Sequence, residues 1–201
     1  MNTHAMAEQK SALRQEMIAR RDALPDAERA RIAAALTAQI VRLPQYAAAG
    51  AVLATMSIGS EWNTRDFLDR ARADGKAVIL PRISSPPKRL QLYAVGNLDT
   101  DLVPGVWNIP EPDSQRCVPV DFGAVDLALV PALAADRARF RLGYGAGYFD
   151  QLLGGRRARP FCVTALPAAF VIESLPREAH DVSVDLVLTE NGAVAPGAGG
   201  A

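Results

Sequence analysis

Apolar side chains recur at helical spacing in the first part of the chain. Leu13, Met17 and Leu24 fall near one face of a helix, with arginine and glutamate residues between them, so residues 10–23 are predicted to form an amphipathic helix. A second helix is predicted over residues 25–42, because acidic residues in its first turn suit the positive end of the helix dipole and a proline follows its end. Two consecutive helices are therefore expected before any strand.

Short apolar runs follow, interrupted by one more helix. Residues 51–56 are almost entirely apolar, which is typical of a strand buried on both faces. A third helix is predicted from a cap at Asn63 or Thr64 to about Ala73. Further strands are predicted at residues 77–80, 90–95, 127–130, 161–165 and 185–188. Helices that alternate with such strands favour an α/β fold, with a largely parallel central sheet and helices on both faces.

Two segments depart from this alternation. Residues 104–112 (PGVWNIPEP) hold too many prolines for a helix or a central strand, so Trp107 is expected in an irregular but rigid segment. Residues 192–201 consist mainly of glycine, alanine and proline, and are predicted to form a disordered tail. With neither a repeat nor a linker in the sequence, residues 1–191 are predicted to form a single domain.

Composition narrows the choice of partners. The chain has 201 residues, 49% of them hydrophobic, which suits one domain with a sizeable core. Its 22 basic residues balance 22 acidic ones, so no long-range attraction draws in a polyanion and nucleic acid is not an expected partner. A local basic patch could still hold a small phosphate.

The chain also lacks the sequence signals of other compartments. No apolar run approaches the roughly 20 residues that cross a bilayer, and residues 1–10 lack the apolar stretch of a signal peptide. Cys117 and Cys162 are far apart and form no metal-binding pattern, so both are predicted to be small buried hydrophobic residues. We therefore expect a cytoplasmic protein with no membrane partner.

The most informative segment for chemistry is Arg141–Asp150 (RLGYGAGYFD), in which every second residue from Gly143 to Gly147 is a glycine. Such a backbone can turn tightly and present N–H groups to an anion. A helix that begins near Gly147 would add its positive dipole end, and Arg141 a planar charged fork. The spacing is neither that of a Walker loop nor that of a dinucleotide fold. The segment therefore predicts a phosphate cradle, with a purely structural turn as the alternative.

The order and spacing of several motifs together resemble the 5-formyltetrahydrofolate cyclo-ligase family, also called 5,10-methenyltetrahydrofolate synthetase, over nearly the full chain. The motifs are Lys10-x-x-x-Arg14, Glu61 with Thr64 after it, Trp107-Asn108-Ile109-Pro110-Glu111-Pro112, Asp126-Leu127-Ala128-Leu129-Val130-Pro131, RLGYGAGYFD, and His180-Asp181-x-x-x-Asp185. The resemblance implies ATP- and Mg²⁺-dependent conversion of 5-formyltetrahydrofolate to 5,10-methenyltetrahydrofolate, with ADP and phosphate released. The formyl oxygen would be phosphorylated, and the 10-nitrogen would then attack.

The resemblance also implies roles for particular residues. The ATP site would comprise Lys10, Arg14, Arg141, Leu142, Gly143, Tyr144, Gly145, Ala146, Gly147, Tyr148 and Phe149. The folate site would comprise Met56, Glu61, Trp107, Tyr148 and Phe149. Arg141 and Tyr148 would be the catalytic residues, while Asp150 and Asp185 would bind Mg²⁺, since a hard cation prefers carboxylate oxygen.

Each assignment has a structural alternative. Lys10 and Arg14, four residues apart on one helix face, could form a solvated basic face. Asp150 could lie on a helix surface, Asp185 at a strand end, and Trp107 in the core. For the whole protein the alternatives are sugar-phosphate or coenzyme A chemistry on the same scaffold, or a regulatory protein that binds folate or nucleotide without turnover. In the leading interpretation the partners are reduced folate and ATP, and the chain is a monomer or weak homodimer.

Overall fold

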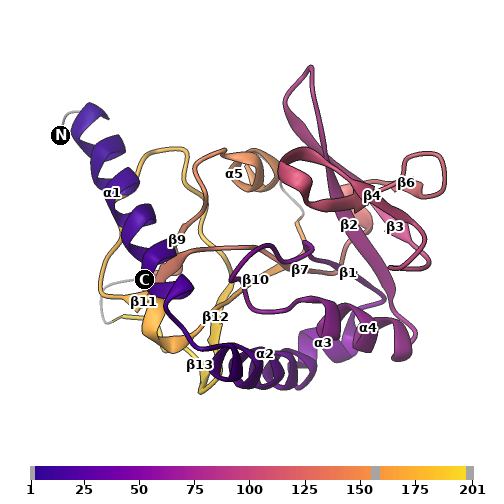
Figure 1. Ribbon diagram of the computed structural model, residues 1–201, viewed down its shortest axis with the longest axis horizontal. Helices are drawn as coiled ribbons and strands as arrows, with labels where there is room; N and C mark the ends of the chain where they lie inside the picture. The colour runs from indigo at the N-terminus through magenta and orange to yellow at the C-terminus, as the bar shows by residue number, and fades with distance from the viewer. Residues whose placement is uncertain (1–2, 155–158, 198–201) are drawn as a thin grey trace.

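A central sheet organises the computed structural model, which describes residues 3–154 and 159–197 (Figure 1). Its order is β13-β12-β10-β7-β1-β2-β3-β6. The parallel strands are β1 (Ala51–Leu53), β2 (Ala77–Ser84), β7 (Leu127–Leu129), β10 (Phe161–Ala165) and β12 (Leu186–Thr189). Antiparallel strands complete the two sides: β3 (Arg89–Val95), β6 (Val118–Val120) and β13 (Gly192–Ala193).

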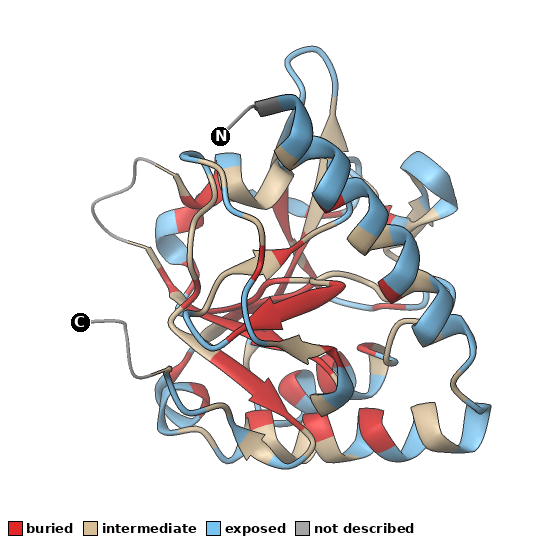
Figure 2. Ribbon diagram, turned by 90° about the vertical axis from the view of Figure 1, so that its left-hand side faces the viewer, coloured by how far each residue is buried: buried red, intermediate tan, exposed pale blue. Residues whose placement is uncertain are grey.

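Helices cover both faces of this sheet. One face carries α2 (Asp26–Val41), α3 (Pro44–Ala48) and α4 (Arg65–Ala73), and the other carries α1 (Thr3–Asp22) and α5 (Tyr148–Leu153) (Figure 1). Successive strand residues point to opposite faces. Val52 accordingly packs in one cluster with Leu36, whereas Leu53 packs in a second cluster with Met17. Buried strands lie between helices whose outer surfaces are exposed (Figure 2). The predicted α/β fold, with its largely parallel sheet, is confirmed.

Several short elements lie outside the predicted pattern. A two-stranded sheet joins β4 (Leu102–Pro104) to β5 (Pro110–Pro112), and a three-stranded sheet joins β8 (Ala134–Asp136), β9 (Arg141–Leu142) and β11 (Val171–Ile172). Among the described residues, 3₁₀ turns lie between β4 and β5 (η1, Val106–Asn108), between β6 and β7 (η2, Phe122–Ala124) and before β11 (η3, Ala168–Phe170). The proline-rich segment is therefore neither helix nor central strand, as predicted, although its two ends pair with each other.

The predicted disorder of residues 192–201 is wrong for residues 192–197. Gly192 has a φ of 112°, which permits a tight turn and brings β13 back along β12. The N–H of Val194 then donates to the carbonyl of Val187 at 2.9 Å. The side of β12 offers unpaired backbone groups, and pairing them orders this stretch. Residues 198–201 lie outside the described residues.

The remaining boundaries move by a few residues. Helix α1 begins at Thr3 rather than near residue 10, and β2 continues to Ser84 rather than ending at Leu80. Cys117 and Cys162 are free and buried, as predicted. Among the described helices, not one has the length and apolar character that a membrane span requires.

Candidate active site

A cavity of about 750 Å³ lies at the carboxyl ends of the parallel strands β1, β2 and β7. Met56 follows β1, Pro131 follows β7, and Leu80 belongs to β2; all three line the cavity. Ligands of open parallel sheets bind outside this edge, and cavities of roughly 300–1,000 Å³ are usual for small molecules. Helix α1, residues 141–150 and the segment before β12 also contribute to the wall.

The glycine-rich segment runs from β9 through a turn into α5, along one side of the cavity. Gly145 has a φ of 98° and Gly147 a φ of 72°, in the left-handed region that residues with a Cβ avoid. Gly147 immediately precedes the first residue of α5, so the predicted helix start is confirmed. Glycine at these two positions is therefore required by the backbone path.

Two cations reach the cavity from α1. The Lys10 residue is only 6% exposed, and its ammonium donates to Glu178 at 2.8 Å and to both carboxylate oxygens of Asp181 at 2.6 and 2.9 Å. The Nε of Arg14 donates to the carbonyl of Gly143 at 2.9 Å. The alternative of a solvated basic face is thus wrong for Lys10, whose charge is buried and paired.

The Asp150 carboxylate accepts hydrogen bonds from two different segments of the chain. Its Oδ1 accepts from Nη2 of Arg141 at 2.9 Å and from the N–H of Val182 at 3.0 Å. Arg141, whose side chain is 3% exposed, also donates to the carbonyl of Val182. The segment that carries Asp181 is therefore fastened to Asp150, and the two carboxylates lie on adjoining parts of the cavity wall.

The acids of this segment are held in their charged forms. Burial alone would raise the pKa of Asp181, but the hydrogen bonds from Lys10 and from the Glu178 N–H outweigh burial and lower it. The Lys10 ammonium likewise lowers the pKa of Glu178. Ligand atoms of Glu178, His180 and Asp181 lie within 4.8 Å of one another, a spacing that a metal ion can bridge.

Asp185 is not brought together with Asp150. Its Oδ2 accepts from the N–H of Cys162 at 2.8 Å, and its Oδ1 pairs with Arg159 at 2.8 Å. Asp185 precedes β12, and residues that precede parallel strands lie at the amino edge of the sheet, opposite the cavity. Within the same motif it is the earlier acid, Asp181, that lines the cavity. The spacing within the motif does not show which of its two acids reaches the cavity.

All five residues expected to contact folate line the cavity: Met56, Glu61, Trp107, Tyr148 and Phe149. Glu61 accepts the N–H of Ile58 at 2.9 Å through Oε2 and the Tyr144 hydroxyl through Oε1. Trp107 is 67% exposed and has a φ of 56°, so the alternative of core packing is wrong for it.

Two further cavity residues were missed by the sequence analysis. Lys88, in the turn between β2 and β3, donates to the carbonyl of Ala146 at 3.2 Å, and its ammonium lies 4.8 Å from the centre of the Tyr148 ring. Glu111 is 3% exposed, and burial raises the pKa of its carboxyl group. Glu111 belonged to a quoted motif, whereas nothing in the sequence marked Lys88.

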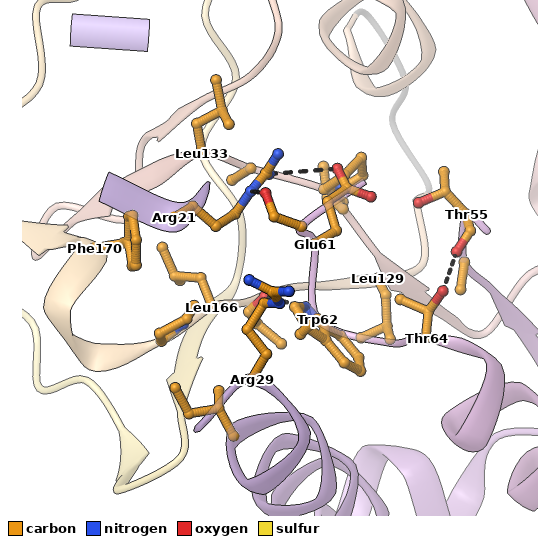
Figure 3. A pocket seen from close by; sticks show the side chains of 18 of the residues that line it. Arg21, Arg29, Thr55, Glu61, Trp62, Thr64, Leu129, Leu133, Leu166 and Phe170 are labelled. Carbon is orange, nitrogen blue, oxygen red and sulfur yellow. Dashed lines mark hydrogen bonds and ion pairs between the residues drawn. The ribbon is translucent and has the colours of Figure 1, made fainter. Parts of the chain in front are cut away.

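A smaller cavity of about 50 Å³ lies behind Glu61 (Figure 3). Trp62 closes one side and donates from Nε1 to the carbonyl of Ala165 at 3.0 Å, while the Thr64 hydroxyl donates to the carbonyl of Thr55 at 2.7 Å. A space of this size holds a few water molecules at most. The larger cavity is therefore the candidate active site.

This fold and its cavity define the class of the protein: an α/β enzyme with a small-molecule site at the carboxyl edge of a parallel sheet. The chain belongs to the 5-formyltetrahydrofolate cyclo-ligase family, whose model matches residues 6–190. The resemblance inferred from the motifs is confirmed.

Individual relatives agree with the family model over most of their length. A 5-formyltetrahydrofolate cyclo-ligase of Mycolicibacterium smegmatis is 31% identical over 90% of this chain and 93% of its own, and one of Mus musculus is 27% identical over 90% and 94%. The NMR structure of Aquifex aeolicus 5,10-methenyltetrahydrofolate synthetase is 29% identical, with a TM-score of 0.80, over 96% of this chain and 95% of that one.

Proposed function

We propose that this chain converts 5-formyltetrahydrofolate to 5,10-methenyltetrahydrofolate with ATP and Mg²⁺, releasing ADP and phosphate. Beyond family membership, one observation carries the proposal. A single cavity is lined by the α1 cations, by the glycine-rich segment, and by Glu61 and Trp107. Two ligands that must react with each other need such a shared space.

The chemistry explains why a nucleotide is required. A formamide carbonyl is a poor electrophile because its nitrogen donates electrons into it, and its oxygen is a poor leaving group. Transfer of the γ-phosphoryl group to that oxygen releases ADP and corrects both faults. The 10-nitrogen then attacks the formyl carbon, the C–O bond breaks to release phosphate, and the 10-nitrogen loses its proton. The protein's part is to position both substrates and to neutralise charge.

The nucleotide side is assigned to Lys10, Arg14 and the segment from Leu142 to Phe149. The bare amides of the glycine-rich turn suit phosphate oxygens, and the two cations of α1 neutralise phosphate charge. Lys10 pairs with Glu178 and Asp181, so phosphates would compete with these acids for its ammonium.

The carboxylates of Asp150, Glu178 and Asp181 offer the hard oxygen donors that Mg²⁺ prefers. Bound there, Mg²⁺ would supply charge neutralisation at the phosphates. Arg141 is buried against Asp150, and we assign it the task of orienting that carboxylate. Asp185, at the opposite edge of the sheet, has no part in this proposal.

The folate side is assigned to Glu61 and the apolar wall around it. The carboxylate of Glu61 can accept paired hydrogen bonds from the amino and ring N–H groups of the pterin. Met56, Trp107 and Phe149 line the same cavity and offer apolar surfaces to a flat ring. Tyr148, the first residue of α5, also lines the cavity, and we assign it to the reacting formyl group.

The direct test combines purified protein, 5-formyltetrahydrofolate, Mg²⁺ and ATP. The expected result is the absorbance of the conjugated methenyl product, accompanied by one ADP for each product molecule and absent when ATP is omitted. Binding of both ligands without product would instead identify a regulatory binding protein. Absence of folate binding would point to other chemistry on the same scaffold.

A further inference from the structure

A chain of hydrogen bonds connects the last turn of α1 to Glu61. Nη1 of Arg21 donates to the Tyr144 hydroxyl at 2.6 Å, and that hydroxyl donates to Oε1 of Glu61. Arg21 and Glu61 both line the small cavity and point toward one another (Figure 3), with Nη1 and Oε1 3.8 Å apart. Their side chains are only 12% and 16% exposed, so little solvent screens the pair.

The direction of these hydrogen bonds is fixed by chemistry. A guanidinium has donors and no acceptor, so the Tyr144 oxygen must accept a hydrogen bond from Arg21. The Tyr144 hydroxyl in turn donates its hydrogen bond to Glu61. Burial, followed by the negative charge of Glu61, raises the pKa of Tyr144, so the hydroxyl stays protonated at neutral pH. The other oxygen of Glu61 accepts from the backbone of Ile58. Both carboxylate oxygens are therefore held.

Arg21 is itself fixed in place by two different contacts. Its Nε donates to the Ser60 hydroxyl at 2.8 Å, next to Glu61 in the chain, and its guanidinium lies 5.8 Å from the centre of the Tyr144 ring. The planar fork of arginine can bridge Ser60 and Tyr144 at once, which the single ammonium of a lysine does less well. Arg21 thus ties the loop that carries Glu61 to the glycine-rich segment that carries Tyr144.

We propose that Arg21 is a positioning residue for the reduced folate: acting through Tyr144 and Ser60, it orients the Glu61 carboxylate toward the pterin. The proposal rests on the proposed function, which assigns Glu61 to the folate. Because Tyr144 belongs to the glycine-rich segment, the same contacts join the folate acid to the nucleotide side of the cavity. Arg21 itself lies in the wall of the smaller cavity, outside the large one.

The test measures the binding of 5-formyltetrahydrofolate and of ATP separately, by isothermal titration of the full chain. Arg21→Ala should raise the Kd for 5-formyltetrahydrofolate about five- to thirtyfold, since hydrogen bonds to a charged group are lost, while the Kd for ATP stays within about twofold. The matched control is Arg20→Ala. Arg20 is next to it on α1 and donates to the carbonyl of Ala169 at 2.7 Å, so its loss should leave both constants unchanged.

Two milder variants separate positioning from folding. Arg21→Lys keeps the charge without the fork and should give an intermediate loss of folate affinity. Tyr144→Phe removes only the hydroxyl and should weaken folate binding in the same direction. In a Glu61→Gln background Arg21→Ala should add little further loss, because its effect passes through Glu61; a general structural effect would add fully in that background.

Thermal melting of each variant accompanies the titrations, and Arg21→Lys and Tyr144→Phe carry the test if Arg21→Ala does not fold. The proposal is overturned if Arg21→Ala behaves like Arg20→Ala, if folate and ATP lose affinity equally, or if the effects of Arg21 and Glu61 add. Wild-type turnover is measured alongside. Folate binding without turnover would sink the proposed function alone, and no folate binding would sink both.

Discussion

The two edges of the central sheet use carboxylates in different ways. At the amino edge, Asp126 precedes β7 and accepts the N–H groups of Gly50 and Ala51 at 2.8 and 2.9 Å, where the neighbouring strand β1 begins. Asp185 precedes β12 and accepts the N–H of Cys162, in the neighbouring strand β10. Each acid links the start of one parallel strand to the neighbouring strand. The donors are backbone N–H groups, which the strand holds in place.

At the carboxyl edge, the carboxylates are paired largely with side-chain cations. Lys10 pairs with Glu178 and Asp181, and Arg141 with Asp150, all in the wall of one cavity. A side-chain cation can turn to a phosphate and leave its carboxylate to a metal ion, whereas a strand N–H cannot. Strand N–H groups therefore hold both aspartates of the amino edge, whereas every acid named at the carboxyl edge is paired with a side-chain cation of the cavity wall.

The largest effect is expected at the carboxyl edge, for Asp150→Asn. The amide keeps a carbonyl oxygen that can still accept from Arg141, so the protein should fold and bind ATP in part. It lacks the charge that a hard divalent ion needs, and kcat should fall at least about a hundredfold. Turnover across a Mg²⁺ titration, with circular dichroism and melting, tests this. Normal turnover at the same Mg²⁺ concentration would show that Asp150 is not a metal ligand.

The next effect is expected for Lys10→Ala and for Arg14→Ala. Each removes a charge-assisted contact to phosphate, so kcat/KM for ATP should fall about ten- to hundredfold. Arg20→Ala, on the same helix but outside the cavity, is the control. If both variants keep the wild-type dependence on ATP, α1 contributes packing only. The assignment of its two cations to ATP would then be wrong.

At the amino edge, Asp185→Asn should change stability rather than turnover. An amide can still accept one hydrogen bond, but the ion pair with Arg159 is lost, so the free energy of unfolding should fall by about 1–2 kcal/mol. Turnover per folded molecule should stay within about twofold at every Mg²⁺ concentration. A raised Mg²⁺ requirement would contradict the structural assignment and return Asp185 to the metal site.

The smallest effect is expected for Glu111→Gln and depends on pH. Glu111 lies in the cavity wall, and burial raises its native pKa above its unfolded value. Between those two values the native state binds more protons than the unfolded state, so wild-type stability falls as the pH rises. The glutamine variant should therefore be more stable at pH 7, by about 1 kcal/mol or less, and should lose that advantage below about pH 4. Melting curves at both pH values decide it.

Much of the architecture could be predicted because long elements leave periodic patterns. The amphipathic turns of α1 and the apolar runs at β7 and β10 identified the α/β class and most of the central sheet. Strands of two or three residues, such as β9 and β11, span too little sequence for a period to show. The order at Gly192 depends on pairing with β12, which is a tertiary contact that local composition does not reveal.

The site could be predicted where a motif is contiguous, and less well where distant segments meet. Arg141–Asp150 was found as one stretch because its glycines and flanking charges are adjacent in the sequence. Choosing between Asp181 and Asp185 required knowing where each one lies relative to the sheet. Although only four residues separate them, Asp181 lies in the cavity wall and Asp185 at the amino edge. The contact between Arg21 and Glu61 joins residues forty positions apart, and no local pattern signals it.

The spacing of residues along helix α1 fixes where its side chains lie relative to one another. Lys10, Arg14, Met17 and Arg21 follow one another at steps of four, three and four residues. One helical face therefore supplies two cations to the cavity, a core residue, and the arginine that contacts Tyr144. One inserted residue would rotate everything before it by about 100° relative to everything after it. This helix can therefore accept substitutions one at a time. A change in its length between Lys10 and Arg21 would instead turn Lys10 away from the direction in which Arg21 points.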